Sequence, residues 1–285
     1  AAHLFIIWII LVRQTPPIGY VPTPKHARSA LMFSLPDPVL TAQAISLEIA
    51  GHRILSDCHL KLYPSEVLAL VGPSGAGKSS LLNILAGRQL SNNCQALSLL
   101  GQDLLRTSLY QTNLLRRRAC GYVAQDASTT LNLRQSAATN IVRRLFDLGD
   151  NRAVDALKQA QKWGQRLGLC PERLHEPVKN FSGGMRQRVQ IAAAMIHQPS
   201  ILFLDEPTAG LDSVAQADFL DVLSNLRNQT QTAMVFVTHD LRLARLIADR
   251  AIVMDQGRIV SESIMDRLLT EPEHLIAQAL VKAMI

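Results

Sequence analysis

The sequence predicts an alternating α/β fold with a buried parallel sheet, and two observations predict it. First, short apolar runs end in a glycine, in two acidic residues, or in Thr-His; they span residues 67–71, 201–204 and 233–237. Runs of four or five apolar residues with polar groups at the carboxyl end are typical of strands covered on both faces. Second, apolar residues between the strands recur at helical spacing, as over 189–196.

Length and composition exclude several classes of protein. The chain has 285 residues, of which 48% are hydrophobic and 18% charged, so it is neither disordered nor fibrous. Its four cysteines are scattered with no C-x-x-C pair, which indicates reduced thiols in a cytosolic protein. A net charge of +6 favours an acidic partner, without choosing among a nucleotide, a nucleic acid and a membrane surface.

The first 38 residues differ from the rest. Leu4–Val12 is an apolar run of nine residues, whereas a membrane-spanning helix needs roughly 20. No basic segment precedes the run, as a signal peptide would require. Six of the thirteen prolines then fall between residues 16 and 38, a density that opposes helices and sheets. We therefore expect residues 1–38 to lie outside the fold, as a membrane-surface anchor or an incidental tail, and 39–285 to form the domain.

A glycine-rich loop follows the apolar run at 67–71 and precedes a helical pattern at 80–85. It fits G-x-x-x-x-G-K-[S/T], in the strand–loop–helix order that this phosphate-binding pattern requires. Glycines let successive backbone N–H groups face one anion, and the helix adds its positive end. Lys78 is placed to reach the β- and γ-phosphates, and the Ser79 hydroxyl to ligate Mg²⁺. The predicted loop residues are Gly72, Pro73, Ser74, Gly75, Ala76, Gly77, Lys78 and Ser79.

An acidic pair, Asp205-Glu206, directly follows the apolar run at 201–204. In a protein with such a phosphate loop, the aspartate at the strand end holds Mg²⁺, directly or through water. The adjacent glutamate is placed to polarise an attacking water as general base. The pair narrows the prediction from nucleotide binding to nucleotide hydrolysis.

Five motifs in fixed order resemble those of the ATP-binding cassette (ABC) ATPases, over roughly residues 40–285. After the phosphate loop come a Q-loop glutamine, the signature motif, the Walker B segment with its D-loop, and the switch histidine. They are carried by Gln125, Phe181–Arg188, Asp205–Asp212 and His239. The resemblance implies a P-loop NTPase of ABC type: a RecA-like core, an antiparallel β subdomain, and a helical subdomain at about 126–184.

By this resemblance, ATP and Mg²⁺ are the expected cofactors. Lys78 and the backbone of 75–80, Ser80 included, bind the phosphates. Ser79 and Asp205 serve Mg²⁺. Gln125 senses the γ-phosphate and the metal and lies at the contact with a membrane permease.

The resemblance also implies catalytic roles and a dimer. Glu206 is the expected base, and His239 contacts the γ-phosphate and the attacking water. The signature residues Ser182, Gly183 and Gly184 stand before an expected helix at 185–197, and helix N-termini bind anions. In the family they cover the ATP that the P-loop of a second subunit holds, so two ATPs are sandwiched in a head-to-tail dimer.

Three departures from the family pattern stand out. Met185 replaces the usual glutamine of the signature, and Ser65 stands where a glycine is preferred in the turn before the 67–71 strand. Residues 47–52 contain no aromatic side chain for stacking on adenine. Aromatic stacking is worth about 0.5–1.5 kcal/mol, so weaker or less base-selective nucleotide binding is expected.

Local patterns at 125–132, 182–189 and 211–217 resemble the peptide/nickel importer branch, with the nickel-type member most similar. The ATPase associated with phosphonate uptake or carbon–phosphorus lyase stays open as the alternative. In this family the solute passes through the permease, and the ATPase does not touch it. His52 and His59 are therefore interpreted as surface histidines.

The rival class is a soluble ABC ATPase acting on nucleic acid. The basic clusters 116–118 and 143–144 are short, and a solvated helix face is the preferred interpretation. About 55 residues separate Gln125 from Ser182, which fits a transporter's compact helical subdomain. The expected partners are a second ABC ATPase subunit in a homo- or heterodimer, transmembrane permease subunits and, indirectly, a solute-binding protein, with no nucleic acid. The expected location is the cytoplasmic face of the inner (plasma) membrane, as a peripheral protein.

Overall fold

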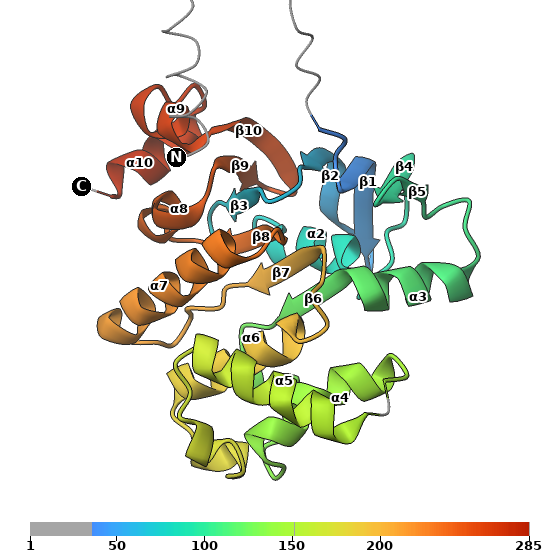
Figure 1. The fold of residues 1–285 in the computed structure, drawn as a ribbon. Coiled ribbons are helices and arrows are strands. Elements are labelled where there is room, and N and C mark those ends of the chain that lie inside the picture. The colour runs from blue at the N-terminus through green and yellow to red at the C-terminus, as the bar shows by residue number, and fades with distance from the viewer. Residues whose placement is uncertain (1–35, 151, 285) are drawn as a thin grey trace, which may run out of the picture. The chain divides into compact units, whose positions relative to one another are not determined.

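The computed structural model describes residues 36–150 and 152–284 (Figure 1). Contacts between residues define a compact unit over Asp37–Ile285. The expectations about the apolar run and most of the proline-rich segment lie outside the described residues. In the part that the structure describes, no helix is long and apolar enough to cross a membrane.

A six-stranded sheet forms the centre, in the order β10-β9-β3-β8-β7-β6. The strands are β3 (Val67–Val71), β6 (Cys120–Val123), β7 (Ile201–Asp205), β8 (Ala233–Thr238), β9 (Arg250–Asp255) and β10 (Arg258–Ile264). The pairs β6–β7, β7–β8, β8–β3 and β3–β9 are parallel, and β10 pairs antiparallel with β9. Every residue of β3, β7 and β8 is buried, as the apolar runs predicted.

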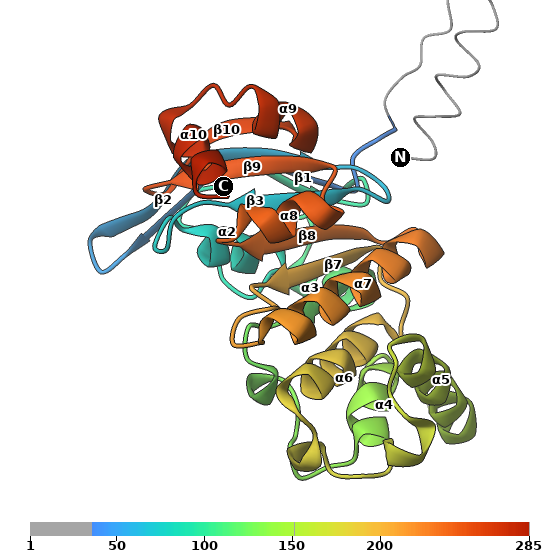
Figure 2. The ribbon, with the colours of Figure 1, turned by 90° about the vertical axis from the view of Figure 1, so that its left-hand side faces the viewer.

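A second, antiparallel sheet has the order β2-β1-β4-β5. Its strands are β1 (Leu40–Ile49), β2 (His52–Leu62), β4 (Ala96–Leu99) and β5 (Gln102–Asp103). Helix α2 (Lys78–Leu85) shares one apolar core with β1, β2 and the central strands. The phosphate loop therefore leads into a helix that packs with both sheets. Figure 2 shows the central strands β9, β3, β8 and β7 in this order.

The remaining helices lie around the central sheet, and some of them extend the domain beyond the β6 edge (Figure 1). They are α3 (Leu109–Ala119), α4 (Ala137–Asp147), α5 (Ala153–Arg166), α6 (Gly183–Met195), α7 (Ser213–Gln229), α8 (Leu241–Ile247), α9 (Met265–Thr270) and α10 (Leu275–Lys282), with 3₁₀ turns at Ala127–Thr129, Pro171–Arg173 and Val178–Asn180. Helices α4 and α5 lie together beyond β6, and α6 leads from them back toward the sheet (Figure 1). One apolar core runs from Trp163 and Phe181 through Val189 to Leu202 and Phe236, so α6 fixes the helical region to the sheet.

Two local predictions are corrected or explained by the backbone. The helix expected at 185–197 begins at Gly183 and ends at Met195. It begins there because the Ser182 hydroxyl accepts a hydrogen bond from Met185 N at 3.3 Å and caps it. Ser65, where the family prefers glycine, has φ of 60°, so the turn keeps a left-handed residue in spite of its Cβ.

Gly121 in β6 lies close against the backbone of α6. A Cβ there would lie 2.4 Å from Ala194 O and 3.0 Å from Leu202 Cδ1. Because the first contact is backbone, Gly121→Ala should shift α6 and destabilise the fold by about 1–3 kcal/mol, as overpacking does. Urea unfolding followed by circular dichroism measures this. Gly184→Ala, whose Cβ would meet Ala215 Cβ at 3.9 Å, is the matched control, and equal stability of the two variants would contradict the prediction.

Candidate nucleotide-binding and catalytic site

The phosphate loop runs from the end of β3 to the first turn of α2. Gly77, the residue before α2, has φ of 93° and no side chain that caps the helix. A Cβ at Gly77 would lie 2.8 Å from Leu55 Cδ2 and 3.0 Å from Ile54 O, so only glycine fits here. The first N–H groups of α2 are consequently left for another acceptor, as at helix N-termini that bind phosphate.

Lys78 is buried, with 4% of its surface exposed. Its Nζ donates hydrogen bonds to Gly72 O and Pro73 O, both at 2.9 Å, so the lysine lies along the loop that it would serve. Burial lowers the pKa of Lys78, and the charges of Glu206 and Asp205 oppose this shift. The amine is thus positioned among backbone oxygens at the loop, and a phosphate oxygen would be its natural charged partner.

Ser79 and Asp205, far apart in sequence, meet at the carboxyl end of β7. The Ser79 hydroxyl donates to Asp205 Oδ1 at 2.7 Å. The Tyr122 hydroxyl, from β6, lies 3.1 Å from Asp205 Oδ2 and 3.0 Å from Asn83 Oδ1. A hydroxyl and a carboxylate at this spacing form a set of hard oxygen donors. Such donors suit Mg²⁺, which proteins hold through one or two such groups together with substrate phosphates.

Glu206 and His239 also come together, at the ends of the neighbouring strands β7 and β8. His239 Nδ1 lies 3.3 Å from Glu206 Oε2. Glu206 has φ of 41°, a left-handed backbone that is costly for glutamate, and its N–H donates to Val237 O at 3.1 Å. The glutamate side chain is 21% exposed and that of His239 63%, so both reach solvent.

Within the described ranges, Gln125 and the signature residues make no hydrogen bond to the phosphate loop, Asp205 or Glu206. The Gln125 side chain is exposed, while its carbonyl accepts a hydrogen bond from Gln187 Nε2 at 3.1 Å. Ser182 and Gly183 are exposed at the start of α6. No hydrogen bond in residues 36–150 and 152–284 connects them to the phosphate loop, so their roles toward a nucleotide stay predictions.

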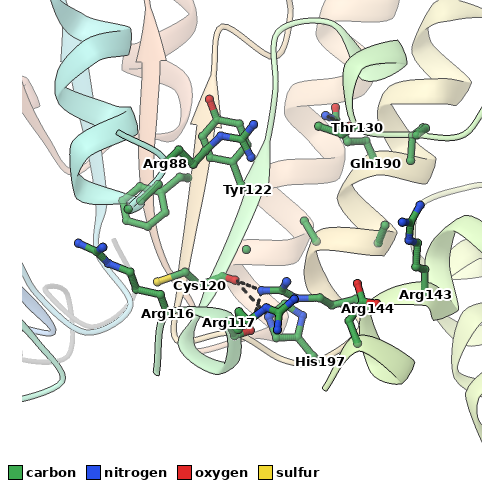
Figure 3. Close-up of a pocket in the computed structure, with 18 of the residues that line it drawn as sticks. Arg88, Arg116, Arg117, Cys120, Tyr122, Thr130, Arg143, Arg144, Gln190 and His197 are labelled. Atoms are coloured by element: carbon green, nitrogen blue, oxygen red, sulfur yellow. Dashed lines mark hydrogen bonds between the residues drawn. The ribbon is translucent and has the colours of Figure 1, made fainter. Parts of the chain in front are cut away.

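A cavity of about 680 Å³ lies beside the β6 edge, between α3 and the helices α4 and α6. Figure 3 shows the polar side chains on its wall. Five arginines line it: Arg88, Arg116, Arg117, Arg143 and Arg144. In the described parts of the chain, no carboxylate oxygen lies within 4.0 Å of these guanidinium groups.

The solvated-face interpretation of the basic clusters is wrong for two of these arginines. Arg144 is half-buried and donates to Cys120 O at 3.2 Å and to Arg117 O at 2.6 Å. The Arg116 Nε is buried without a hydrogen-bond partner among the described residues, and burial lowers the Arg116 pKa. Both side chains line the cavity beside β6, Arg116 from α3 and Arg144 from α4, an arrangement that spacing along the sequence does not reveal.

Sequence reasoning also missed Tyr122 and Asn83. Tyr122 stands three residues before Gln125 in an apolar strand, where a tyrosine usually signals only burial. The pairing of β6 with β7 brings its hydroxyl to the carboxylate that ends β7, and no pattern in the sequence marks that pairing.

The sheet order, the phosphate loop and the acidic strand end define a P-loop nucleoside triphosphatase. The family model described as ABC transporter matches residues 55–209, more than half of the chain. The chain therefore belongs to the ABC transporter family, as an ATP-binding subunit. It is an ATP hydrolase of the kind that is coupled to transport, as the sequence motifs predicted.

Similar proteins extend over most of the chain. The putative phosphonates utilization ATP-binding protein PhnK of Escherichia coli (strain K12) is 37% identical over 248 residues, 87% of this chain and 98% of the relative. The di/tripeptide transport ATP-binding protein DppF of Pseudomonas aeruginosa (strain UCBPP-PA14) is 34% identical over 236 residues, 82% and 72% of the two chains.

Solved structures agree on the fold. The protein cbiO1 of Clostridium perfringens, part of the ABC transporter complex cbiONQ, has a TM-score of 0.74 at 23% identity, covering 83% of this chain and 92% of that one. A dimeric post-hydrolysis state of the ATP-binding cassette MJ0796, bound to ADP and Pi, has a TM-score of 0.71 at 24% identity. The match covers 79% of this chain and 98% of that chain. The predicted P-loop fold with mixed α/β sheets is confirmed.

Proposed function

We propose that this chain binds Mg²⁺–ATP at residues 72–80 and hydrolyses it with Glu206 as general base. The observation that carries the proposal is the convergence of Ser79 on Asp205 at 2.7 Å and of His239 on Glu206 at 3.3 Å. Both pairs stand at the carboxyl ends of central strands, beside the free N-terminus of α2.

Each residue then has a task in phosphoryl transfer. The α2 N–H groups and Lys78 neutralise the phosphates, and Ser79 and Asp205 hold Mg²⁺, which when bound offsets charge on the β- and γ-phosphates. Glu206 accepts a proton from the attacking water, and His239 contacts the γ-phosphate and the same water. Positioning and electrostatic stabilisation supply most of the rate in such reactions.

A head-to-tail dimer completes the proposed site. The exposed signature residues at the start of α6 would cover the ATP that a second ABC ATPase subunit holds, whether an identical chain or a related one. Support comes from their exposure, from the helix N-terminus that they form, and from the dimeric state described for MJ0796.

The proposed coupling partner is a membrane permease, with this chain peripheral on the cytoplasmic side and a solute-binding protein acting indirectly. Import of small peptides or nickel is the first candidate. It is supported by the branch-like motifs at 125–132, 182–189 and 211–217 and, for peptides, by relatives such as DppF. Phosphonate uptake or a carbon–phosphorus lyase is the second candidate, supported by PhnK, which is matched over 98% of its length.

Co-purification discriminates between these candidates. A tagged chain expressed in its native cell and extracted in mild detergent should bring down membrane permease subunits if it energises import. The alternative predicts a soluble lyase complex in the detergent-free fraction. Mass spectrometry identifies the captured proteins, and the untagged chain is the control. Recovery of neither kind of partner, from cells in which the chain is abundant, would contradict both assignments.

A further inference from the structure

Tyr122 lies between the proposed metal site and the arginine-lined cavity. Its hydroxyl reaches Asp205 Oδ2 at 3.1 Å and Asn83 Oδ1 at 3.0 Å. Its ring lies under the Arg88 guanidinium, 4.1 Å from the ring centroid. Arg88 and Tyr122 both line the cavity (Figure 3), so one side chain contacts the cavity wall and the carboxylate together.

We propose that Tyr122 is a positioning residue that orients Asp205 for Mg²⁺, and that Arg88 makes this orientation depend on the arginine-lined cavity. The inference rests on the proposed role of Asp205 as a metal ligand. It adds a residue outside the phosphate loop and the acidic strand end, and it gives the cavity a physical connection to the hydrolytic site.

The geometry of the carboxylate explains why a hydroxyl is needed. Rotation about the terminal torsion of an aspartate is broad, so hydrogen bonds must select one orientation. Ser79 donates to one oxygen of Asp205, and Tyr122 donates to the other. With the second donor removed, the carboxylate keeps one tether and can turn about it, which weakens its hold on a metal.

The phenol carries one proton, so it donates to either Asp205 or Asn83 at a given moment. The charged carboxylate is the stronger acceptor. A phenol, with an ordinary pKa of about 10, keeps its proton at neutral pH. The hydroxyl therefore remains a donor under the conditions in which the enzyme works.

Arg88 is the member of the connection that the cavity can influence. It is exposed, has no carboxylate within 4.0 Å in the described residues, and rests on the electron-rich face of the tyrosine. An anionic group entering the cavity would compete for its guanidinium. The tyrosine ring would then lose its contact with the Arg88 guanidinium.

The test measures Mg²⁺ dependence of nucleotide binding with the complete chain and a fluorescent ATP analogue. Tyr122→Phe keeps the ring under Arg88 and removes only the hydroxyl. We expect the Mg²⁺ concentration for half-maximal enhancement of binding to rise about tenfold, as for loss of a partner that orients a metal ligand. Affinity in EDTA should stay unchanged, which also reports that the variant is folded.

Two matched controls sharpen the result. Tyr63 also lies under an arginine, Arg250 at 5.6 Å, and Tyr63→Phe should leave the Mg²⁺ curve unchanged. Arg88→Ala should shift the curve in the same direction as Tyr122→Phe and by less, whereas Arg143→Ala, on the same cavity wall, should not.

Different outcomes overturn different claims. Equal Mg²⁺ curves for Tyr122→Phe and the unaltered chain would refute the positioning role while leaving the proposed function intact. Equal shifts for Arg88→Ala and Arg143→Ala would reduce the effect to general charge and refute the connection. If the unaltered chain binds the nucleotide without any Mg²⁺ enhancement, the assignment of Asp205 itself fails.

Discussion

Replacement of Glu206 by glutamine is expected to stop ATP turnover while nucleotide binding persists. The substitution keeps the size of the side chain and its place at the end of β7, but an amide does not accept the proton of the attacking water. Loss of a general base costs roughly 10²- to 10⁴-fold in rate. The contacts of Lys78 and of the α2 N-terminus are untouched, so affinity for ATP should be retained.

Because ATP would then remain bound, the variant should accumulate as the proposed dimer. Phosphate release measures turnover, and light scattering after gel filtration with Mg²⁺–ATP measures the dimer. Glu271→Gln, at an exposed carboxylate after α9, is the control and should behave as the unaltered chain. Normal phosphate release by Glu206→Gln would show that another group is the base.

The central fold could be predicted from sequence because its determinants are local. Each fully buried strand is one apolar run, and the glycine at 77 is required by the turn in which it stands. The P-loop and the two acids at the carboxyl end of β7 could also be predicted from the sequence, because each is a short continuous motif. The order of the strands could not be predicted from the sequence. That order places β8 between β3 and β7, and it brings Ser79, which follows the phosphate loop, to Asp205 at the end of β7.

What escaped prediction depends on contacts over long sequence separations. Tyr122 and Asp205 are 83 residues apart and meet because β6 pairs with β7. The five arginines gather because α3, α4 and the segment after α2 line one cavity beside the same edge strand. From the sequence, Arg116 looked like part of a solvated helix face, and only packing shows that its guanidinium is partly enclosed. Polar groups of this kind carry no periodic signal, so spacing rules do not detect them.

Replacement of Lys78 by alanine is expected to abolish tight nucleotide binding. In the structure the amine donates to Gly72 O and Pro73 O, and it is the buried cation of the phosphate loop. Hydrogen bonds to charged groups contribute about 1.5–3 kcal/mol, so affinity should fall roughly 10- to 150-fold at 1.4 kcal/mol per tenfold. Titration with a fluorescent ATP analogue in EDTA isolates this contribution from that of Mg²⁺.

A folding defect must be separated from the loss of a charge. Lys78→Met retains most of the side-chain volume at this buried position and should lose affinity to the same extent as Lys78→Ala, with thermal unfolding close to that of the unaltered chain. Lys158→Ala, on the exposed surface of α5, should bind nucleotide normally. Since both Lys78 variants leave the α2 N–H groups in place, a residual weak affinity measures what the helix N-terminus contributes alone. Affinity unchanged in Lys78→Met would show that phosphate binding does not depend on this amine.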